Sequence, residues 1–148
     1  MTGVSVGGID MTSFSSHLAV IDSGTSYFYL NTNLFNNVIS NFFSDCTLVS
    51  NVTSCPCTST PNWPTFAFNF TNVEVFIEPA DYTINVSAGV CSYLFGSIST
   101  VSEILLGDIF FRNYIITFDK PNSQIGFSGI RMTNITSFNP VTPVVPAT

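Results

Sequence analysis

Val20-Ile21-Asp22-Ser23-Gly24-Thr25-Ser26 is the stretch that decides the fold of this chain. An apolar, β-prone run ends in a carboxylate, a glycine follows two residues later, and hydroxyl side chains flank the glycine. On such a loop the Gly24 amide and the Thr25 hydroxyl can donate hydrogen bonds to Asp22 and hold its carboxylate in plane. We therefore predict that Asp22 is a working carboxylate, with an ordinary Asp-x-Gly turn between strands as the alternative.

A second apolar block follows later in the chain, Ile104-Leu105-Leu106-Gly107-Asp108-Ile109-Phe110-Phe111-Arg112-Asn113-Tyr114. Two shorter runs come after it, at residues 115–119 and 124–127. Taken together, these motifs resemble the C-terminal lobe of pepsin-like aspartic proteases. That lobe carries an apolar-Asp-[Ser/Thr]-Gly-[Ser/Thr] loop, a Leu-Gly-Asp-x-Phe-x-Arg-x-Tyr block and a Phe-Asp-x-x-x-x-x-[Ile/Val]-Gly strand pair, in this order. The resemblance covers about residues 3–130.

The resemblance implies a mostly β fold, a pepsin-like acid protease lobe. We expect closed or partly closed antiparallel β barrel or sheets with one or two short helices. Residues 1–133 would form this lobe, and residues 134–148, which contain prolines three apart, would form an extended tail.

The resemblance also assigns roles around the loop. It implies that Asp22 is catalytic, that Ser23, Gly24 and Thr25 support it, that Val20 and Ser26 contact substrate, and that Leu106, Gly107 and Asp108 lie beside the site. Aspartic proteases hydrolyse peptides with two carboxylates that share one proton around a water. Asp10, Asp108 and Asp119 stand in no second Asp-[Ser/Thr]-Gly motif. We therefore expect the partner aspartate to come from an N-terminal lobe or from a second copy of the chain.

These points predict an aspartic endopeptidase that cleaves polypeptides at acidic pH. This chain would supply the second catalytic aspartate and half of the substrate cleft, and alone it would be an inactive half. Two alternatives remain: a homodimeric protease of the retroviral kind, and a non-catalytic pepsin-like module for binding or inhibition. We expect neither a cofactor nor a metal ion.

Composition restricts the partners. The 148 residues form one domain by length, 45% of them are hydrophobic, and no apolar run approaches the length of a membrane span. The net charge is -6, with only Arg112, Lys120 and Arg131 basic, so nucleic acid is a poor partner. A chain with so few fixed cations gains little positive charge when its carboxylates protonate, which suits an acidic compartment.

Four cysteines and four glycosylation sequons indicate the secretory pathway. The cysteines are Cys46, Cys55, Cys57 and Cys91, and the sequons begin at Asn51, Asn69, Asn85 and Asn134. Two disulfides are expected rather than a zinc site, because C-x-C is the wrong spacing for a structural zinc knuckle. The family resemblance implies a bridge from Cys57 to Cys91, which leaves Cys46 to Cys55. We therefore expect a secreted or lysosomal/vacuolar location. Residues 1–20 do not have the pattern of a signal peptide, so we expect that the targeting segment lies elsewhere and that the chain is incomplete.

Local patterns predict the elements. Apolar residues at helical spacing predict a helix over residues 33–43, capped by Asn31 or Thr32. Residues 44–61, rich in Ser, Thr, Asn and Cys, are expected to be a disulfide-stapled surface loop. Strands are expected at residues 18–21, 65–70, 73–77, 82–86, 91–95, 105–107, 114–118 and 125–127, with a short helix at 108–113. His17 is expected at the surface without a catalytic role.

Overall fold

The computed structural model of this chain describes residues 1–99, 102–129 and 139–141. Strands dominate the described residues, and most of the strand pairs are antiparallel. The strands are β1 (Gly3–Val6), β2 (Ile9–Asp10), β3 (Ala19–Ile21), β4 (Phe28–Leu30), β5 (Thr47–Val49), β6 (Val52–Pro56), β7 (Phe66–Asn69), β8 (Glu74–Ile77), β9 (Thr83–Ser87), β10 (Val90–Tyr93), β11 (Phe95–Ser97), β12 (Ile104–Leu106), β13 (Tyr114–Asp119), β14 (Gln124–Gly129) and β15 (Asn139–Val141). The helices are α1 (Thr32–Phe42), α2 (Pro79–Tyr82) and α3 (Asp108–Phe111), with short 3-10 turns η1 (Thr12–Phe14) and η2 (Cys57–Asn62). The mostly β prediction is confirmed.

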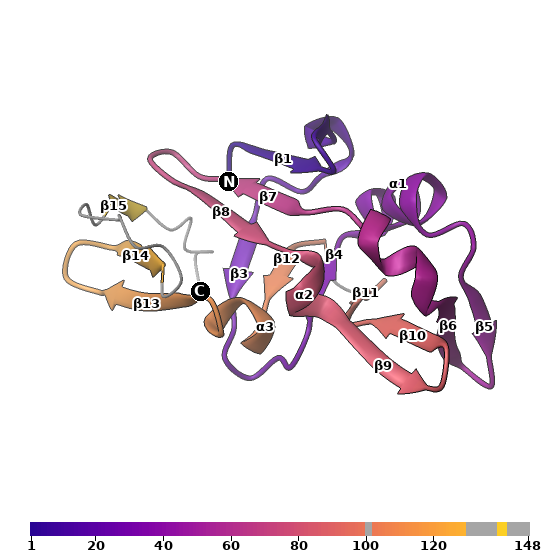
Figure 1. The fold of residues 1–148 in the computed structure, drawn as a ribbon. Helices are drawn as coiled ribbons and strands as arrows, with labels where there is room; N and C mark the ends of the chain where they lie inside the picture. The colour runs from indigo at the N-terminus through magenta and orange to yellow at the C-terminus, as the bar shows by residue number, and fades with distance from the viewer. Residues whose placement is uncertain (100–101, 130–138, 142–148) are drawn as a thin grey trace.

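The strands form four small sheets, with orders β2-β1-β7-β8, β5-β6-β10-β9, β11-β4-β12-β3 and β13-β14-β15. In Figure 1 the β5–β6 and β9–β10 hairpins lie at one end of the molecule and β13–β15 lie at the other. The sheet that contains β3 and β12 lies between these ends (Figure 1). The loop that carries Asp22 therefore belongs to the middle of the fold.

The expected helix is present as α1, and its apolar face packs into the core through Leu34 and Val38, both fully buried. Asn31 is its N-cap residue, as predicted, but its side chain does not cap the helix. Instead Asn31 accepts a hydrogen bond from the Ser16 amide and donates one to the Phe14 carbonyl, so it joins the helix start to the segment before β3.

Aromatic side chains fill the core. Phe28, Phe66 and Phe95 pack against one another with ring centroids 5.1–5.3 Å apart. Tyr82 is fully buried beside them and donates a hydrogen bond to the Pro64 carbonyl at 2.6 Å. Burial raises the pKa of this phenol, so it stays protonated as a donor. These rings belong to one hydrophobic core together with buried aliphatic side chains from the sheets.

Two segments differ from the sequence-based expectation. Residues 47–56, expected to be loop, form the β5–β6 hairpin, in which Val49 pairs with Val52. The sequence pattern of this segment did not predict strands, because most of its side chains are polar or face solvent on both sides of the hairpin. Residues 79–82, expected as a turn followed by strand, form α2, and the Asp81 carboxylate accepts a hydrogen bond from the Glu78 amide at its start.

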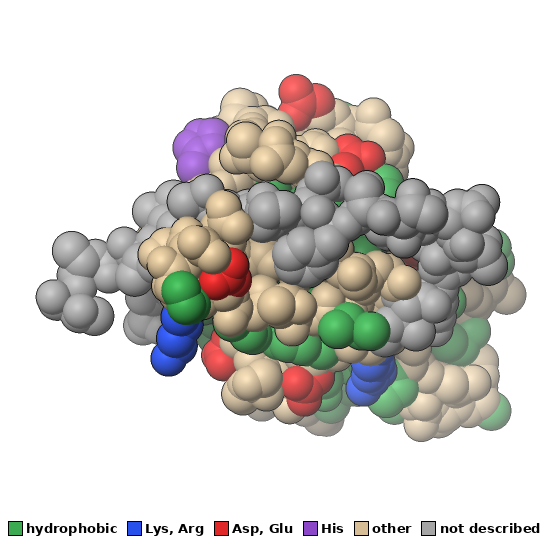
Figure 2. All heavy atoms as spheres, turned by 90° about the vertical axis from the view of Figure 1, so that its left-hand side faces the viewer, with side chains coloured by type: hydrophobic (Ala, Val, Ile, Leu, Met, Phe, Trp, Pro, Cys, Tyr) green, Lys and Arg blue, Asp and Glu red, His purple; other side chains and the backbone are tan. Residues whose placement is uncertain are grey.

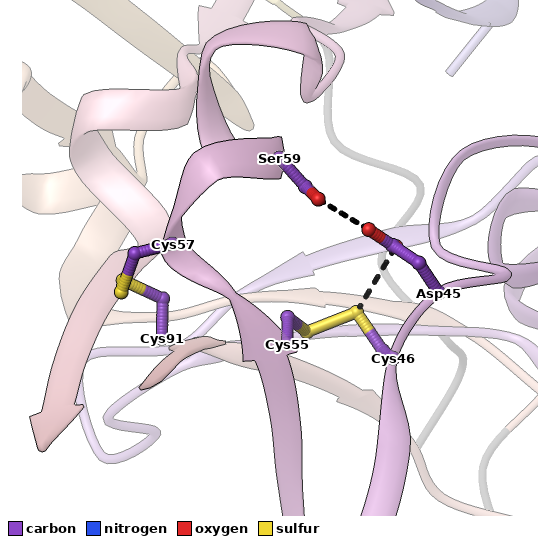
Figure 3. The surroundings of a disulfide bond; sticks show 6 residues. All are labelled: Asp45, Cys46, Cys55, Cys57, Ser59 and Cys91. Atoms are coloured by element: carbon purple, nitrogen blue, oxygen red, sulfur yellow. Dashed lines mark hydrogen bonds between the residues drawn. A yellow bond between two sulfur atoms is a disulfide. The ribbon is translucent and has the colours of Figure 1, made fainter. Parts of the chain in front are cut away.

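Two disulfides crosslink the end of the molecule where the β5–β6 and β9–β10 hairpins lie (Figure 3). We call the Cys46–Cys55 bond, which joins the residue just before β5 to β6, the hairpin disulfide. The Cys57–Cys91 bond, which we call the long-range disulfide, ties η2 to β10 across 34 residues. No cysteine among the described residues is free. Beside the hairpin disulfide, the Ser59 hydroxyl donates a short hydrogen bond to the Asp45 carboxylate (Figure 3).

The remaining expectations concern the ends and the surface. Of the predicted tail, residues 139–141 form β15, which pairs with β14, and the rest lies outside the described residues together with the domain boundary expected at 133. Within the described residues no helix has the length and apolar character that a membrane crossing needs. Figure 2 views the side where β13–β15 lie, and the charged side chains visible there are scattered over the surface.

Candidate active site

The Asp22 loop begins where β3 ends. β3 pairs in parallel with β12, with Ile21 opposite Leu106, and β12 also pairs with β4 on its other side. The Asp22 amide donates to the Leu106 carbonyl at 3.0 Å, so the ladder between the two strands continues into the first residue of the loop. The chain then turns, with the Thr25 amide donating to the Asp22 carbonyl at 3.2 Å.

Each carboxylate oxygen of Asp22 accepts a hydrogen bond from its own loop. The Gly24 amide donates to Oδ1 at 2.9 Å, and the Thr25 hydroxyl donates to Oδ2 at 2.6 Å. These two bonds, the Thr25 bond first, hold the pKa of Asp22 below its ordinary value, because both stabilise the ionised form. Asp22 is only partly covered, so its carboxylate is oriented and still open to solvent.

Gly107 lets the chain after β12 approach the loop. A Cβ atom at this position would lie 2.1 Å from the Thr25 carbonyl oxygen and 2.2 Å from that of Tyr27. Directly after the glycine, the Asp108 amide donates to the Thr25 carbonyl at 2.7 Å. No side chain fits in this space, because both neighbours are backbone atoms of the loop.

These contacts bring together the residues expected beside the site. Leu106 is fully buried behind the loop, and Gly107 and Asp108 lie against Thr25. Val20, the residue two before Asp22, is 38% exposed, and the side chains of Ser23 and Ser26 are exposed as well. The substrate contacts expected for Val20 and Ser26 therefore need no movement of the loop to become accessible.

The other candidate carboxylates and the histidine lie in other settings. Asp10 accepts a hydrogen bond from the Thr12 amide at 2.9 Å, and Asp119 accepts two from Asn122 in the turn between β13 and β14. Asp10 is the last residue of β2 and Asp119 the last residue of β13, and each carboxylate accepts hydrogen bonds from residues just after its strand. His17 is exposed, and its carbonyl accepts a hydrogen bond from the chain's amino terminus.

Comparison with known proteins agrees with this geometry. The family model described as eukaryotic aspartyl protease matches residues 1–130. This chain belongs to that family. It is 28% identical to pepsin A of Gallus gallus over 132 residues, which is 86% of this chain and 34% of the relative. It is 33% identical to pepsin A of Bos taurus over 116 residues, 76% of this chain and 31% of the relative, and 28% identical to pregnancy-associated glycoprotein 2 of Bos taurus over 130 residues, 86% and 34%.

The chain thus spans about a third of the length of the curated relatives that it matches. One Asp-[Ser/Thr]-Gly motif is present in its sequence. For this member of the aspartyl protease family, the described residues therefore provide one oriented carboxylate and the strands that hold it.

Sequence reasoning missed one residue beside this aspartyl protease loop. Tyr27 contributes a carbonyl to the close approach of Gly107 and leaves its side chain 42% exposed at the end of the loop. An aromatic residue two places after Thr25 is only a weak signal for it. Tyr114, the last residue of the Leu-Gly-Asp-x-Phe-x-Arg-x-Tyr block, accepts a hydrogen bond from the Phe76 amide at 2.8 Å through its hydroxyl oxygen, and so ties β13 to β8.

Proposed function

We propose that this chain is part of an aspartic endopeptidase in which Asp22 is one of two catalytic aspartates. The observation that carries the proposal is the carboxylate of Asp22, which receives one donor on each oxygen and remains open to solvent. Asp10 also receives a hydroxyl and an amide donor, both from Thr12, but the Asp22 loop differs from it because the backbone at Gly107 packs directly against it.

In the proposed reaction a water lies between Asp22 and a second carboxyl group. The ionised carboxylate takes a proton from the water as the water oxygen attacks the peptide carbonyl carbon, and the protonated partner donates a proton toward the carbonyl oxygen. The Gly24 and Thr25 donors lower the proton affinity of Asp22, so the pair keeps one negative charge down to acidic pH. The two aspartates then titrate as one coupled unit.

The second aspartate comes from outside this chain in our proposal. The sequence has one Asp-[Ser/Thr]-Gly motif, and Asp10 and Asp119 are strand-end residues that bond to the residues after their strands. An N-terminal lobe is the proposed partner, and it would close a cleft over the exposed side chains of Val20 and Ser26 to bind a polypeptide. The two disulfides and the low basic content support a secreted or lysosomal/vacuolar location.

The test measures cleavage of a fluorogenic polypeptide between about pH 2 and 6. The chain is assayed alone over a range of concentrations, and again after co-expression with an amino-terminal lobe that carries an Asp-Thr-Gly loop. We expect activity only in the second case, and we expect Asp22→Asn to lower it by roughly 10²- to 10⁴-fold. Activity of the chain alone that rises with the square of its concentration would instead establish a homodimeric enzyme.

Asp10→Asn is the matched control, because Asp10 is also an exposed carboxylate whose pKa is lowered by hydrogen bonds to Thr12. This variant should keep full activity. Unchanged activity in Asp22→Asn would refute the catalytic assignment. Peptide binding without cleavage in every combination would favour the non-catalytic module.

A further inference from the structure

Aliphatic side chains are exposed along both edges of the β5-β6-β10-β9 sheet. On the β5–β6 hairpin, Leu48 is 70% exposed, Val49 56% and Val52 48%. On β9, Ile84 is 43% and Val86 48% exposed. β5 and β9 are the two edge strands of this sheet, which lies at one end of the molecule (Figure 1).

These edges lack the charges with which proteins usually protect an exposed edge strand. Residues 47–56 and 83–93 contain no Asp, Glu, Lys or Arg. An uncharged edge with exposed β-branched side chains is a template for pairing with another chain. Something other than side-chain charge must therefore keep this sheet from pairing with other molecules.

A glycosylation sequon stands at the centre of each exposed apolar group. Asn51 lies in the turn between Val49 and Val52, has a φ of 63°, and is exposed. Asn85 lies on edge strand β9 between Ile84 and Val86 and is also exposed. A sugar chain on Asn51 would extend from the turn beside Val49 and Val52. Side chains alternate between faces along β9, so Asn85 leaves from the face opposite to Ile84 and Val86. A sugar chain on Asn85 would instead stand along the edge strand and obstruct another chain from pairing with it.

The sequon at Asn69 has a different environment. Asn69 lies on β7, an inner strand, where it pairs with Gly3 on β1 and with Glu74 on β8. The side chain is only partly exposed, and its Nδ2 atom lies 3.7 Å from where a Cβ on Gly3 would be. An attached glycan would have to leave across the neighbouring strand β1. The fourth sequon, at Asn134, lies outside the described residues.

We propose that Asn51 and Asn85 carry N-linked glycans, that Asn69 does not, and that the two glycans keep the aliphatic edges of the β5-β6-β10-β9 sheet from pairing with another chain. In the modification, the side-chain amide nitrogen forms a bond to the anomeric carbon of a sugar delivered on a polyprenyl diphosphate. The bond from that carbon to the diphosphate oxygen breaks, the lipid diphosphate leaves, and the amide gives up one proton. This inference does not depend on the proposed peptidase function.

Occupancy is tested on the chain secreted from a eukaryotic host. An amidase that removes N-glycans converts each occupied asparagine to aspartate, and heavy-oxygen water marks that aspartate for peptide mass spectrometry. We expect the mark at Asn51 and Asn85 and none at Asn69. A mark at Asn69, or its absence at either of the other two, would overturn the assignment.

Shielding is tested separately on the folded glycoprotein, so that no variant has to fold without its glycans. An endoglycosidase trims each glycan to a single sugar, and light scattering reports the apparent mass. We expect a shift from monomer to larger species, and we expect Val49→Lys combined with Ile84→Lys to prevent that shift after trimming. The control Asn69→Gln should match the unmodified chain before and after trimming. An unchanged apparent mass after trimming would overturn the shielding role.

Discussion

Replacing Gly107 by alanine should force β12 away from the Asp22 loop. The new Cβ would stand 2.1 Å from the Thr25 carbonyl oxygen, well inside van der Waals contact, and the atoms it meets are backbone that cannot rotate away. Relief requires the two segments to separate. Separation breaks the hydrogen bonds from the Asp108 amide to Thr25 and from the Asp22 amide to Leu106.

The expected loss of stability follows from these contacts. Two backbone hydrogen bonds contribute about 1 kcal/mol each to the free energy of unfolding, and overpacking costs about 1–3 kcal/mol. Gly107→Ala should therefore lower the free energy of unfolding by about 3–5 kcal/mol. This is a large share of the 5–15 kcal/mol that is typical of a domain.

Urea unfolding followed by tryptophan fluorescence measures this loss, since Trp63 is the single tryptophan and is only 5% exposed. Gly96→Ala is the control within the same sheet. Its Cβ would meet the Tyr29 ring at 3.3 Å, a side chain that can shift, so we expect a change within about 1 kcal/mol. Both variants lose the same unfolded-chain entropy. Equal urea midpoints for the two variants, with equal slopes, would refute the close-approach argument.

Two further predictions concern the Asp22 carboxylate and the disulfides. Thr25→Val should raise the pKa of Asp22 toward its ordinary value, as followed by carboxyl NMR titration of the chain; an unchanged pKa would mean that the hydroxyl contributes nothing. The pKa of Asp22 is lower in the folded chain than the ordinary Asp value of about 3.9, so the stability that this hydrogen bond contributes is fully present above that value. It is lost as the pH falls through the folded-state pKa. The free energies of unfolding of wild type and Thr25→Val should therefore converge at low pH. Replacing both cysteines of the long-range disulfide by serine should lower the free energy of unfolding by about 4 kcal/mol, because this bond closes a loop of 34 residues. Replacing both cysteines of the hairpin disulfide should lower it by about 3 kcal/mol, because that bond closes a loop of 9 residues. Thermal melts of the two double variants compare these losses, and a greater loss from the hairpin disulfide would contradict the loop-entropy account.

Much of the fold could be predicted because its signals are local. The periodic apolar face of α1 lies within eleven residues, and the strand before Asp22 is a short β-prone run that ends in a turn sequence. The Gly7-Gly8 turn between β1 and β2 has positive φ angles that favour glycine. Each of these features depends on neighbours in sequence, so single-sequence patterns are enough to find them.

Other elements were missed for physical reasons. The β5–β6 hairpin was expected to be a loop, because its exposed strands lack the alternation that marks a half-buried strand, and cross-strand pairing with a disulfide stabilises it instead. Helix α2 was missed because four residues are too few for a helical period, although the Glu78 and Asp81 side chains form a capping box at its start.

The sequence alone determined which carboxylate lies on a loop with hydrogen-bond donors. The order Asp22-Ser23-Gly24-Thr25 places the Gly24 amide and the Thr25 hydroxyl within reach of Asp22, because hydrogen bonds over two or three residues depend only on local turn geometry. The tertiary structure alone decided that β12 inserts between β3 and β4, with Gly107 pressed against Thr25. The pairing of β12 with β3 joins segments more than eighty residues apart, and its parallel register depends on how the sheet packs over the aromatic core. The family resemblance placed Gly107 beside the loop, but its contact with the Thr25 carbonyl exists only in the folded chain, because it joins backbone segments that are distant in sequence.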